Sequence, residues 1–288
     1  NQKLGVNGEN MVYLDLSHKD SKELDIKLGG ILEIYEKFVG DDPRKVPMKI
    51  FPAVHYSMGG LWVDYDQMTN IPGLFAAGEC DYSMHGANRL GANSLLSAVH
   101  GGMEAGPAAV NYMRGLDQAT ESVSEALFNF NEREEIERFN NILAMDGTEN
   151  AYQIHRELGE LMTDNVTVVR YNDKLEATDK KIQELRERFH KISATDTARW
   201  SNQGASFIRQ LDHMLDLARV ITLGALKRDE SRGAHYKPEF PERNDEQFMK
   251  TTMARYKDGE VDISYEDIDV SLIPPRKRDY SKKGAKTK

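Results

Sequence analysis

The chain has 288 residues, of which 39% are hydrophobic and 30% charged, and its formal net charge at pH 7 is -9. This length can support one large domain or two smaller ones with apolar cores, and the negative charge argues against nucleic acid as the main partner. The single cysteine, Cys80, excludes an internal disulfide framework and indicates a reducing compartment. No apolar run approaches the roughly 20 residues of a membrane-spanning helix, so we expect membrane association to come through a partner.

The amino-terminal segment predicts a strand followed by a helix. Residues 11–16 alternate apolar with polar side chains, which is the pattern of a half-buried strand. Asp20 or Ser21 can cap the helix that follows, and Gly40 is a suitable C-cap residue. Gly29-Gly30 lies inside the apolar pattern, and we expect this pair to interrupt the helix.

A histidine follows the next predicted strand, which covers residues 48–54. A histidine at a strand end is more often structural than functional. Gly59-Gly60 comes shortly after His55 and permits close backbone approach to a ligand, which favours a binding role. Both interpretations of His55 stay open on these residues alone. Residues 61–64 predict a further strand, and residues 66–70 predict a surface turn.

The chain is organised around residues 71–97, which combine a predicted strand, a polar loop and a helix start. The apolar residues 74–77 are set off by Pro72-Gly73 and Gly78, and they predict a buried strand that ends at a tight turn. Glu79 then lies at the carboxyl end of this strand. Ligands of open α/β folds usually bind at such an edge.

A helix is expected from about residue 93 to residue 113, with Asn93 or Ser94 as its N-cap. Its first turn offers backbone N–H groups and a partial positive charge to an anionic or electron-rich group. Arg89 precedes it, and a guanidinium is a flat fork of donors that matches a carboxylate. With Glu79 nearby, this arrangement suits a cofactor on the helix end and an acidic substrate held by Arg89.

The same residues also have structural interpretations. Arg89 can form a salt bridge and Glu79 can cap a turn, and on the residues alone each interpretation carries about the same weight as the functional one. We expect the Cys80 thiol to be buried and inert, because nothing near it in the sequence supplies an activating base.

Residues 120–227 predict four helices, because apolar residues recur there every three or four positions in four successive stretches. We expect an antiparallel four-helix arrangement with its own core, and we interpret the stripes as packing surfaces and not as a cofactor site. The four stripes are Leu127, Phe130, Ile136, Phe139 and Leu143; Ile154, Leu158, Leu161 and Met162; Leu175, Thr178, Ile182, Leu185, Phe189 and Ile192; and Ile208, Leu211, Leu215 and Ala218.

The last segment predicts a β-hairpin and a frayed tail. Residues 251–256 and 261–265 flank Lys257-Asp258-Gly259-Glu260, and Asp-Gly accepts the positive φ angles of a tight turn. The basic residues 276–288 follow a proline pair and predict an extended tail, for which solubility is a simpler interpretation than binding.

Three motifs, in this order, resemble the flavoprotein subunit of succinate dehydrogenase and fumarate reductase. Their length and their span over nearly the whole chain make the resemblance specific, whereas a lone Gly-Glu would carry little weight. The motifs are His55-Tyr56-Ser57-Met58-Gly59-Gly60; Gly78-Glu79 with His85-Gly86-Ala87-Asn88-Arg89-Leu90-Gly91-Ala92-Asn93-Ser94-Leu95-Leu96; and Glu230-Ser231-Arg232-Gly233-Ala234-His235.

The resemblance implies an α/β plus all-α architecture, the carboxyl-terminal part of an FAD-binding flavoprotein. Residues 1–47 would end a capping domain, and residues 48–118 would complete the FAD-binding domain. Residues 119–228 would form the helical bundle domain, and residues 229–288 a small tail domain with the hairpin. No G-x-G-x-x-G fingerprint occurs and the first residue is Asn1, so we expect the carboxyl-terminal half of a longer protein, inactive alone.

The resemblance also implies oxidation of succinate to fumarate with FAD as the cofactor. His55 and Arg89 would bind the dicarboxylate substrate. The family's proton-shuttling arginine and covalent flavin histidine match no residue of this chain, so we expect no catalytic residue and no metal ligand within it. The residues assigned to the cofactor are Glu79, which would accept hydrogen bonds from ribityl hydroxyls, and Asn93, Ser94 and Leu95, which would face the flavin ring.

The family's partners are an iron–sulfur subunit and membrane anchor subunits, which would place the protein peripherally on the cytoplasmic side of the inner or cell membrane. Two alternatives remain: L-aspartate oxidase, which shares several of these elements, and a non-catalytic module that docks an iron–sulfur partner. Gly91-Ala92 and Gly233-Ala234-His235 favour succinate dehydrogenase over the oxidase. Residues 231–235 are expected at a domain or subunit junction, without a role derived from the residues.

Overall fold

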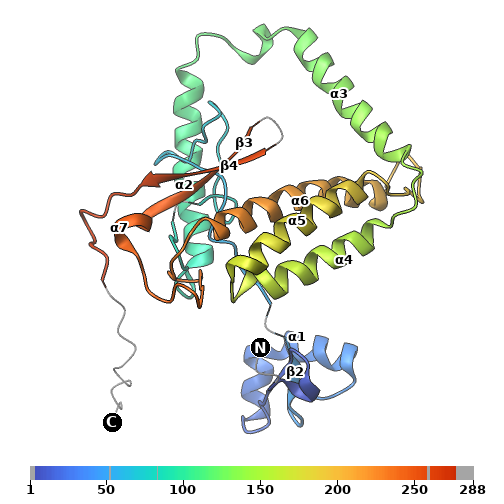
Figure 1. Cartoon of the computed structure of the whole chain (residues 1–288), viewed down its shortest axis with the longest axis vertical. Helices are drawn as coiled ribbons and strands as arrows, with labels where there is room; N and C mark the ends of the chain where they lie inside the picture. The colour runs from blue at the N-terminus through green and yellow to red at the C-terminus, as the bar shows by residue number, and fades with distance from the viewer. Residues whose placement is uncertain (1–3, 52, 83, 258–259, 277–288) are drawn as a thin grey trace. The chain divides into compact units, whose positions relative to one another are not determined.

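The computed structural model describes residues 4–51, 53–82, 84–257 and 260–276. The chain divides into two compact units, Asn1–Ser57 and Met58–Lys288, each with its own apolar core. Its described part mixes helices with two small antiparallel sheets (Figure 1). Among the described residues, no helix has both the length and the apolar character that crossing a membrane requires.

In the first unit, a helix packs against a two-stranded sheet. Helix α1 begins after Asp20, whose carboxylate accepts two backbone hydrogen bonds from the first turn, and it ends at Gly40, which has a φ of 88°. Both ends are as predicted. Leu24, Leu32 and Met48 form the core. The elements are η1 (Val6–Gly8), β1 (Val12–Leu14), α1 (Ser21–Val39) and β2 (Met48–Ile50), and β1 pairs antiparallel with β2.

Two predictions for this unit are wrong. Helix α1 runs through Gly29-Gly30 without a break, because the burial of Leu24 and Leu32 on either side offsets a propensity cost of about 1 kcal/mol per glycine. Strand β2 ends at Ile50 and not at residue 54, because β1 offers it a short partner. His55 therefore lies in irregular backbone beyond the strand and not at its end.

The second unit opens with irregular backbone that leads to a long helix. The predicted strands at 61–64 and 74–77 are wrong, because in the described structure these residues form isolated β-bridges, such as the one between Met68 and Phe75. In the described residues, neither segment lies beside an extended segment long enough to form consecutive hydrogen-bonded pairs. Helix α2 (Asn93–Arg114) follows and ends at Gly115, as predicted.

Helices α4, α5 and α6 pack around one apolar core (Figure 1). The predicted stripes of these helices supply it, including Ile154 of α4, Leu185 of α5 and Leu211 of α6, all without solvent exposure. The elements of this region are η2 (Thr120–Ser122), α3 (Glu125–Leu143), α4 (Ala151–Met162), the π-helical turn η3 (Thr163–Thr167), α5 (Asn172–Phe189) and α6 (Gln203–Leu226).

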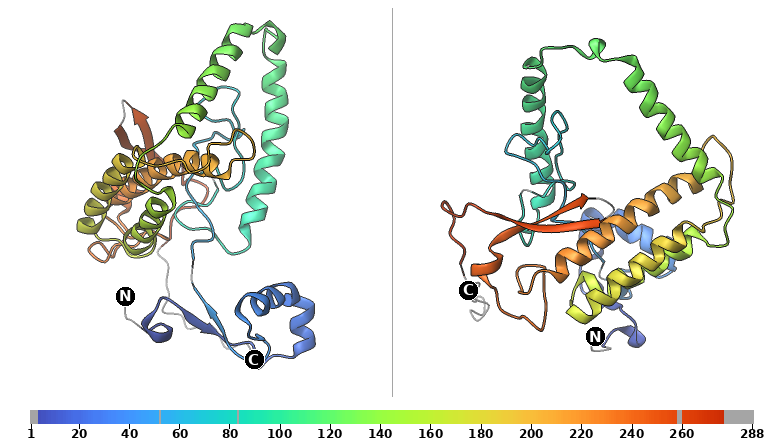
Figure 2. Two further views of the ribbon diagram at one scale, coloured as in Figure 1. Left: turned by 90° about the vertical axis from the view of Figure 1, so that its right-hand side faces the viewer. Right: turned by 45° about the horizontal axis from the view of Figure 1, so that its top comes forward.

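Helix α3 is not an equal member of this bundle, which corrects the prediction of four packed helices. None of its residues is buried in the described structure, and Leu127 and Phe130 are each 57% exposed. Its carboxyl end reaches the core through Ile142, while Figures 1 and 2 show the rest of α3 directed away from α4 and α5. The apolar stripe therefore predicted the helix, but the contact of α3 with α6 buries no residue of the stripe within the described chain.

The carboxyl-terminal segment returns to α6 as a β-hairpin. Strands β3 (Lys250–Lys257) and β4 (Glu260–Asp267) pair with Lys257 opposite Glu260, which confirms the predicted two-residue connection, and both strands contact α6 (Figure 2). The short helix α7 (Asp245–Phe248) precedes them. The turn residues 258–259 lie outside the described residues, as does the predicted tail beyond residue 276.

Candidate functional site

The N-cap residue of α2 offers no capping side chain. Its N-cap residue is Ala92, whose φ of 65° is left-handed and whose methyl group accepts no hydrogen bond. The prediction that Asn93 or Ser94 caps the helix is wrong, because both lie inside it, and the Asn93 amide donates to the Leu90 carbonyl at 3.3 Å. The N-cap side chain therefore does not compete with a ligand for the partial positive charge of the first turn.

Arg89 adds a full positive charge at the same place. Its side chain is half-buried, and Nη1 donates to the Leu90 carbonyl at 3.2 Å, the acceptor that the Asn93 amide also uses. One carbonyl therefore holds both the guanidinium and the beginning of α2. A cation and a helix N-terminus at one point favour an anionic ligand.

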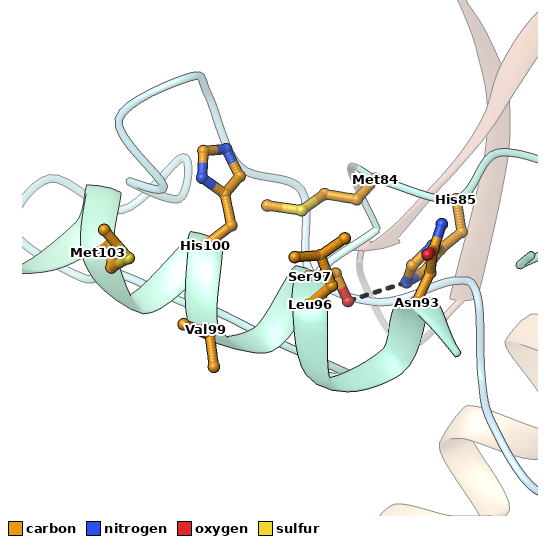
Figure 3. A pocket seen from close by; sticks show the side chains of 8 residues that line it. All are labelled: Met84, His85, Asn93, Leu96, Ser97, Val99, His100 and Met103. Carbon is orange, nitrogen blue, oxygen red and sulfur yellow. Dashed lines mark hydrogen bonds between the residues drawn. The ribbon is translucent and has the colours of Figure 1, made fainter. Parts of the chain in front are cut away.

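An open pocket of about 470 Å³ lies along the first turns of α2 (Figure 3). His85 Nε2 lies 3.1 Å from Ser97 Oγ, and this hydroxyl donates to the Ser94 carbonyl at 2.9 Å. Since the serine hydroxyl has one proton, His85 Nε2 carries the donating proton in this arrangement. The pocket is lined by Met84, His85, Asn93, Leu96, Ser97, Val99, His100 and Met103.

The structure brings part of the predicted cofactor site together. Asn93 lines the pocket, Ser94 lies half-buried in the same helical turn, and Leu95 is 76% exposed beside them. Glu79 is exposed and follows Gly78, which has a φ of 92°. A Cβ added to this glycine would lie 3.4 Å from a side chain of α2, so the glycine brings the Glu79 segment against that helix.

The sequence also carried a signal for pocket residues that we did not predict. Leu96, His100 and Met103 recur at three- and four-residue spacing along α2, and they therefore share one face. Leu96 and Met103 are 66% and 67% exposed, which is unusual for large apolar side chains on such a face. Steps of three and four residues counted from Asn93 lead to these side chains, so the sequence pattern could have predicted that they line the pocket.

His55 and Cys80 both have exposed side chains. His55 belongs to the first unit, where its side chain is exposed, and its assignment to substrate stays a prediction. Cys80 is exposed, so the prediction of a buried thiol is wrong; its backbone carbonyl accepts from the Leu61 amide at 2.7 Å, which holds the residue in a surface turn. No group of metal-ligating side chains gathers within the described ranges.

Comparison with known proteins places this geometry in a family. The chain is 72% identical over 285 residues to the succinate dehydrogenase flavoprotein subunit of Bacillus subtilis, an alignment that covers 98% of this chain and 49% of that protein. The chain belongs to the succinate dehydrogenase and fumarate reductase flavoprotein family. Residues 2–95 match the family described as FAD binding domain, and residues 155–280 match the one described as fumarate reductase flavoprotein C-term.

Other members of the succinate dehydrogenase and fumarate reductase flavoprotein family match over a similar share of the chain at lower identity. The Escherichia coli fumarate reductase flavoprotein subunit is 37% identical, over 94% of this chain and 45% of that protein. The structure of E. coli quinol fumarate reductase matches with a TM-score of 0.86 at 35% identity, over 95% of this chain and 47% of that one. Mycobacterium smegmatis Sdh1 matches with a TM-score of 0.74 at 30% identity, over 92% and 44%. The chain spans about half the length of these relatives.

Proposed function

We propose that the full-length protein oxidises succinate to fumarate with FAD as its hydride acceptor and passes the electrons to an iron–sulfur subunit. The shared Leu90 carbonyl carries this proposal, because it holds the Arg89 guanidinium and the beginning of α2 at one point beside an open pocket. A dicarboxylate needs a forked cation, and a flavin ring gains from positive potential near N1 and the C2 carbonyl.

In this proposal, Arg89 and His55 each bind a carboxylate of the substrate. The guanidinium of Arg89 presents two parallel N–H donors, which match a carboxylate in bidentate fashion and fix its plane. His55 donates one hydrogen bond from its ring. Holding both carboxylates orients the central CH2–CH2 bond, which converts a bimolecular encounter into an oriented reaction.

The residues at the start of α2 fit the cofactor. FAD, when bound, supplies the acceptor for a hydride, which side chains cannot provide. The backbone amides of Ser94 and Leu95 present donors that stabilise negative charge, and the methyl group of the N-cap residue Ala92 does not compete for a ligand there. The Asn93 amide already donates to the Leu90 carbonyl, so Asn93 would take part through its side chain, which lines the pocket. Glu79 accepts hydrogen bonds from ribityl hydroxyls. Gly78 supports this role, because it brings the Glu79 segment against α2.

The partners proposed for the full-length protein follow from the assemblies of its relatives. The structural match with quinol fumarate reductase of E. coli supports association with an iron–sulfur subunit and membrane anchor subunits. The protein would then lie peripherally on the cytoplasmic side of the inner or cell membrane.

The test is an assay of the full-length protein in flavin-replete form with succinate and with L-aspartate, following reduction of an artificial electron acceptor. Turnover with succinate and none with aspartate is expected. Turnover with aspartate would support an L-aspartate oxidase and contradict the proposal. Flavin titration of residues 1–288 alone is expected to show no tight binding, because this chain carries no G-x-G-x-x-G fingerprint for the dinucleotide.

A further inference from the structure

Residues 232–235 form a tight turn. The Arg232 amide donates to the His235 carbonyl at 2.8 Å, and the His235 amide donates back to the Arg232 carbonyl at 3.0 Å. Gly233 occupies the first central position with a φ of 60°, a conformation that glycine adopts at little cost. The turn is therefore closed by two backbone hydrogen bonds and depends on its glycine.

A buried ion-pair cluster holds one side of the 232–235 turn. Arg232 grips the Glu230 carboxylate with two hydrogen bonds, at 2.8 and 3.0 Å, and also donates to Asp245 at 2.7 Å. Glu230 is fully buried and accepts a further hydrogen bond from the Asn244 amide at 2.9 Å. Arg232 cannot move without breaking several charge-assisted bonds.

The helical region holds the other side of the turn. His235 Nε2 donates to the Arg228 carbonyl at 2.9 Å, because Nδ1 is already the acceptor for Arg170 Nη1 at 2.5 Å. Arg170 Nε in turn donates to the Val166 carbonyl at 2.6 Å, in the π-helical turn η3. The 232–235 turn is thus anchored at both ends to the folded body of the second unit.

The exposed tip of this turn lies against the loop that carries Arg89. The Ala234 amide donates to the Ala87 carbonyl at 2.9 Å. A Cβ added to Gly233 would lie 2.3 Å from the Ala87 carbonyl oxygen and 2.6 Å from its carbon, so even alanine would displace the backbone at Ala87. Ala87 stands next to Gly86, which has a φ of 57°, in a loop without regular secondary structure.

We propose that Gly233 and Ala234 are positioning residues for Arg89. The loop of residues 84–92 is rich in small residues and has no strand or helix to stiffen it. The anchored turn fixes the Ala87 carbonyl and thereby sets where Arg89 presents its guanidinium. A misplacement of about 1 Å at a binding group can cost about 100-fold in rate. This inference rests on the proposed role of Arg89 in binding substrate.

The test is Gly233→Ala in the full-length protein. We expect the KM for succinate to rise and kcat/KM to fall by about 10- to 100-fold at wild-type flavin content. The thermal midpoint should fall as well, because alanine is strained at the left-handed φ of this position. Gly40→Ala is the matched control, because Gly40 also has a positive φ, 88°, but no atom lies within 4 Å of the added Cβ. Wild-type kinetics for Gly233→Ala would overturn the inference.

A double variant separates positioning from general damage. If Gly233 acts through Arg89, Gly233→Ala adds little to the effect of Arg89→Lys, whereas additive losses would overturn the inference. If Arg89→Lys itself behaves as wild type, the proposed function fails. If Arg89→Lys is impaired and Gly233→Ala is normal, only the present inference fails.

A second variant covers the case in which Gly233→Ala does not fold. Ala234→Pro removes the N–H that donates to Ala87 and leaves both hydrogen bonds that close the turn, since neither uses the Ala234 amide. Ala234 is not among the residues with a positive φ. The proline Cδ would stand in place of the N–H, in front of the Ala87 carbonyl oxygen that lies 2.9 Å from the Ala234 nitrogen, so the variant displaces Ala87 as well as removing the hydrogen bond. A rise in the KM for succinate at wild-type flavin content supports the inference, and an unchanged KM overturns it.

Discussion

Replacement of Glu230 by glutamine tests the buried ion-pair cluster directly. The fully buried carboxylate accepts hydrogen bonds from Arg228 at 2.7 Å, from Arg232 at 2.8 and 3.0 Å, and from the Asn244 amide at 2.9 Å. Burial raises the pKa of Glu230, but the hydrogen bonds from Arg232, the Asn244 amide and Arg228 outweigh it and hold this pKa below 4.5. In the variant, two guanidinium groups would face a neutral amide.

The size of the effect follows from these contacts. Removal of one partner from a buried ion pair costs about 3–5 kcal/mol. Asp245, which lies 2.7 Å from Arg232, would still pair with it in the variant, and this argues for the lower end of that range, about 3 kcal/mol. Because 1 kcal/mol corresponds to about 2–4 °C for a unit of this size, the thermal midpoint should fall by about 6–12 °C.

The assay is thermal unfolding of the full-length protein, followed by calorimetry at pH 7. Glu260→Gln is the matched control, because Glu260 pairs with Arg219 at 2.9 Å but its side chain is 74% exposed, and exposed pairs contribute about 1 kcal/mol or less. A shift for Glu230→Gln no larger than that of the control would refute the reasoning. The difference in unfolding free energy between the wild type and Glu230→Gln should be largest above pH 4.5. It should decrease as the pH falls through the pKa of Glu230 in the folded state, which is lower than 4.5.

Two further stability predictions follow. Burial, and then the charge of Arg170, lower the pKa of His235 from 6.5 to about 4. The free energy of unfolding of the wild type should therefore fall by up to about 3 kcal/mol as the pH falls from 6.5 to 4. His235→Asn should reduce this pH dependence in unfolding measurements, and an unchanged pH dependence would contradict the prediction. Leu215→Ala, in the core face of α6, should lower the free energy of unfolding by about 2–5 kcal/mol in denaturant unfolding. Leu217→Ala, on the same helix but 61% exposed, should lower it by about 1 kcal/mol or less. Equal losses for the two variants would contradict the assignment of Leu215 to the core.

Local signals predicted the ends of elements well. Asp20 and Gly40 mark the ends of α1 because a carboxylate cap and a left-handed glycine act within one turn of the helix. Lys257 pairs with Glu260, as predicted from the Asp-Gly sequence between the two strands, because such a sequence favours a tight hairpin connection that fixes the register. Such features need no information about distant residues, so the sequence contains them in full.

Features that depend on partners distant in sequence could not be predicted. Residues 74–77 form only isolated β-bridges in the described structure, and α3 contacts α6 without burying any described residue of its stripe, although both patterns are sound locally. The contact between Ala87 and Ala234 joins residues far apart in sequence, and no spacing rule indicates it. The motif around Arg89 predicted a binding function, but its support by the 232–235 turn required the structure.

The most direct measurement of the central claim is the steady-state kinetics of Arg89→Lys in the full-length, flavin-replete protein. Lysine keeps the charge but loses one arm of the fork, so one charge-assisted hydrogen bond of about 1.5–3 kcal/mol is lost and kcat/KM for succinate should fall about 10- to 150-fold. Arg114→Lys, an exposed change at the opposite end of α2, should leave the kinetics unchanged. Wild-type kcat/KM for Arg89→Lys would contradict the claim that this arginine binds the substrate.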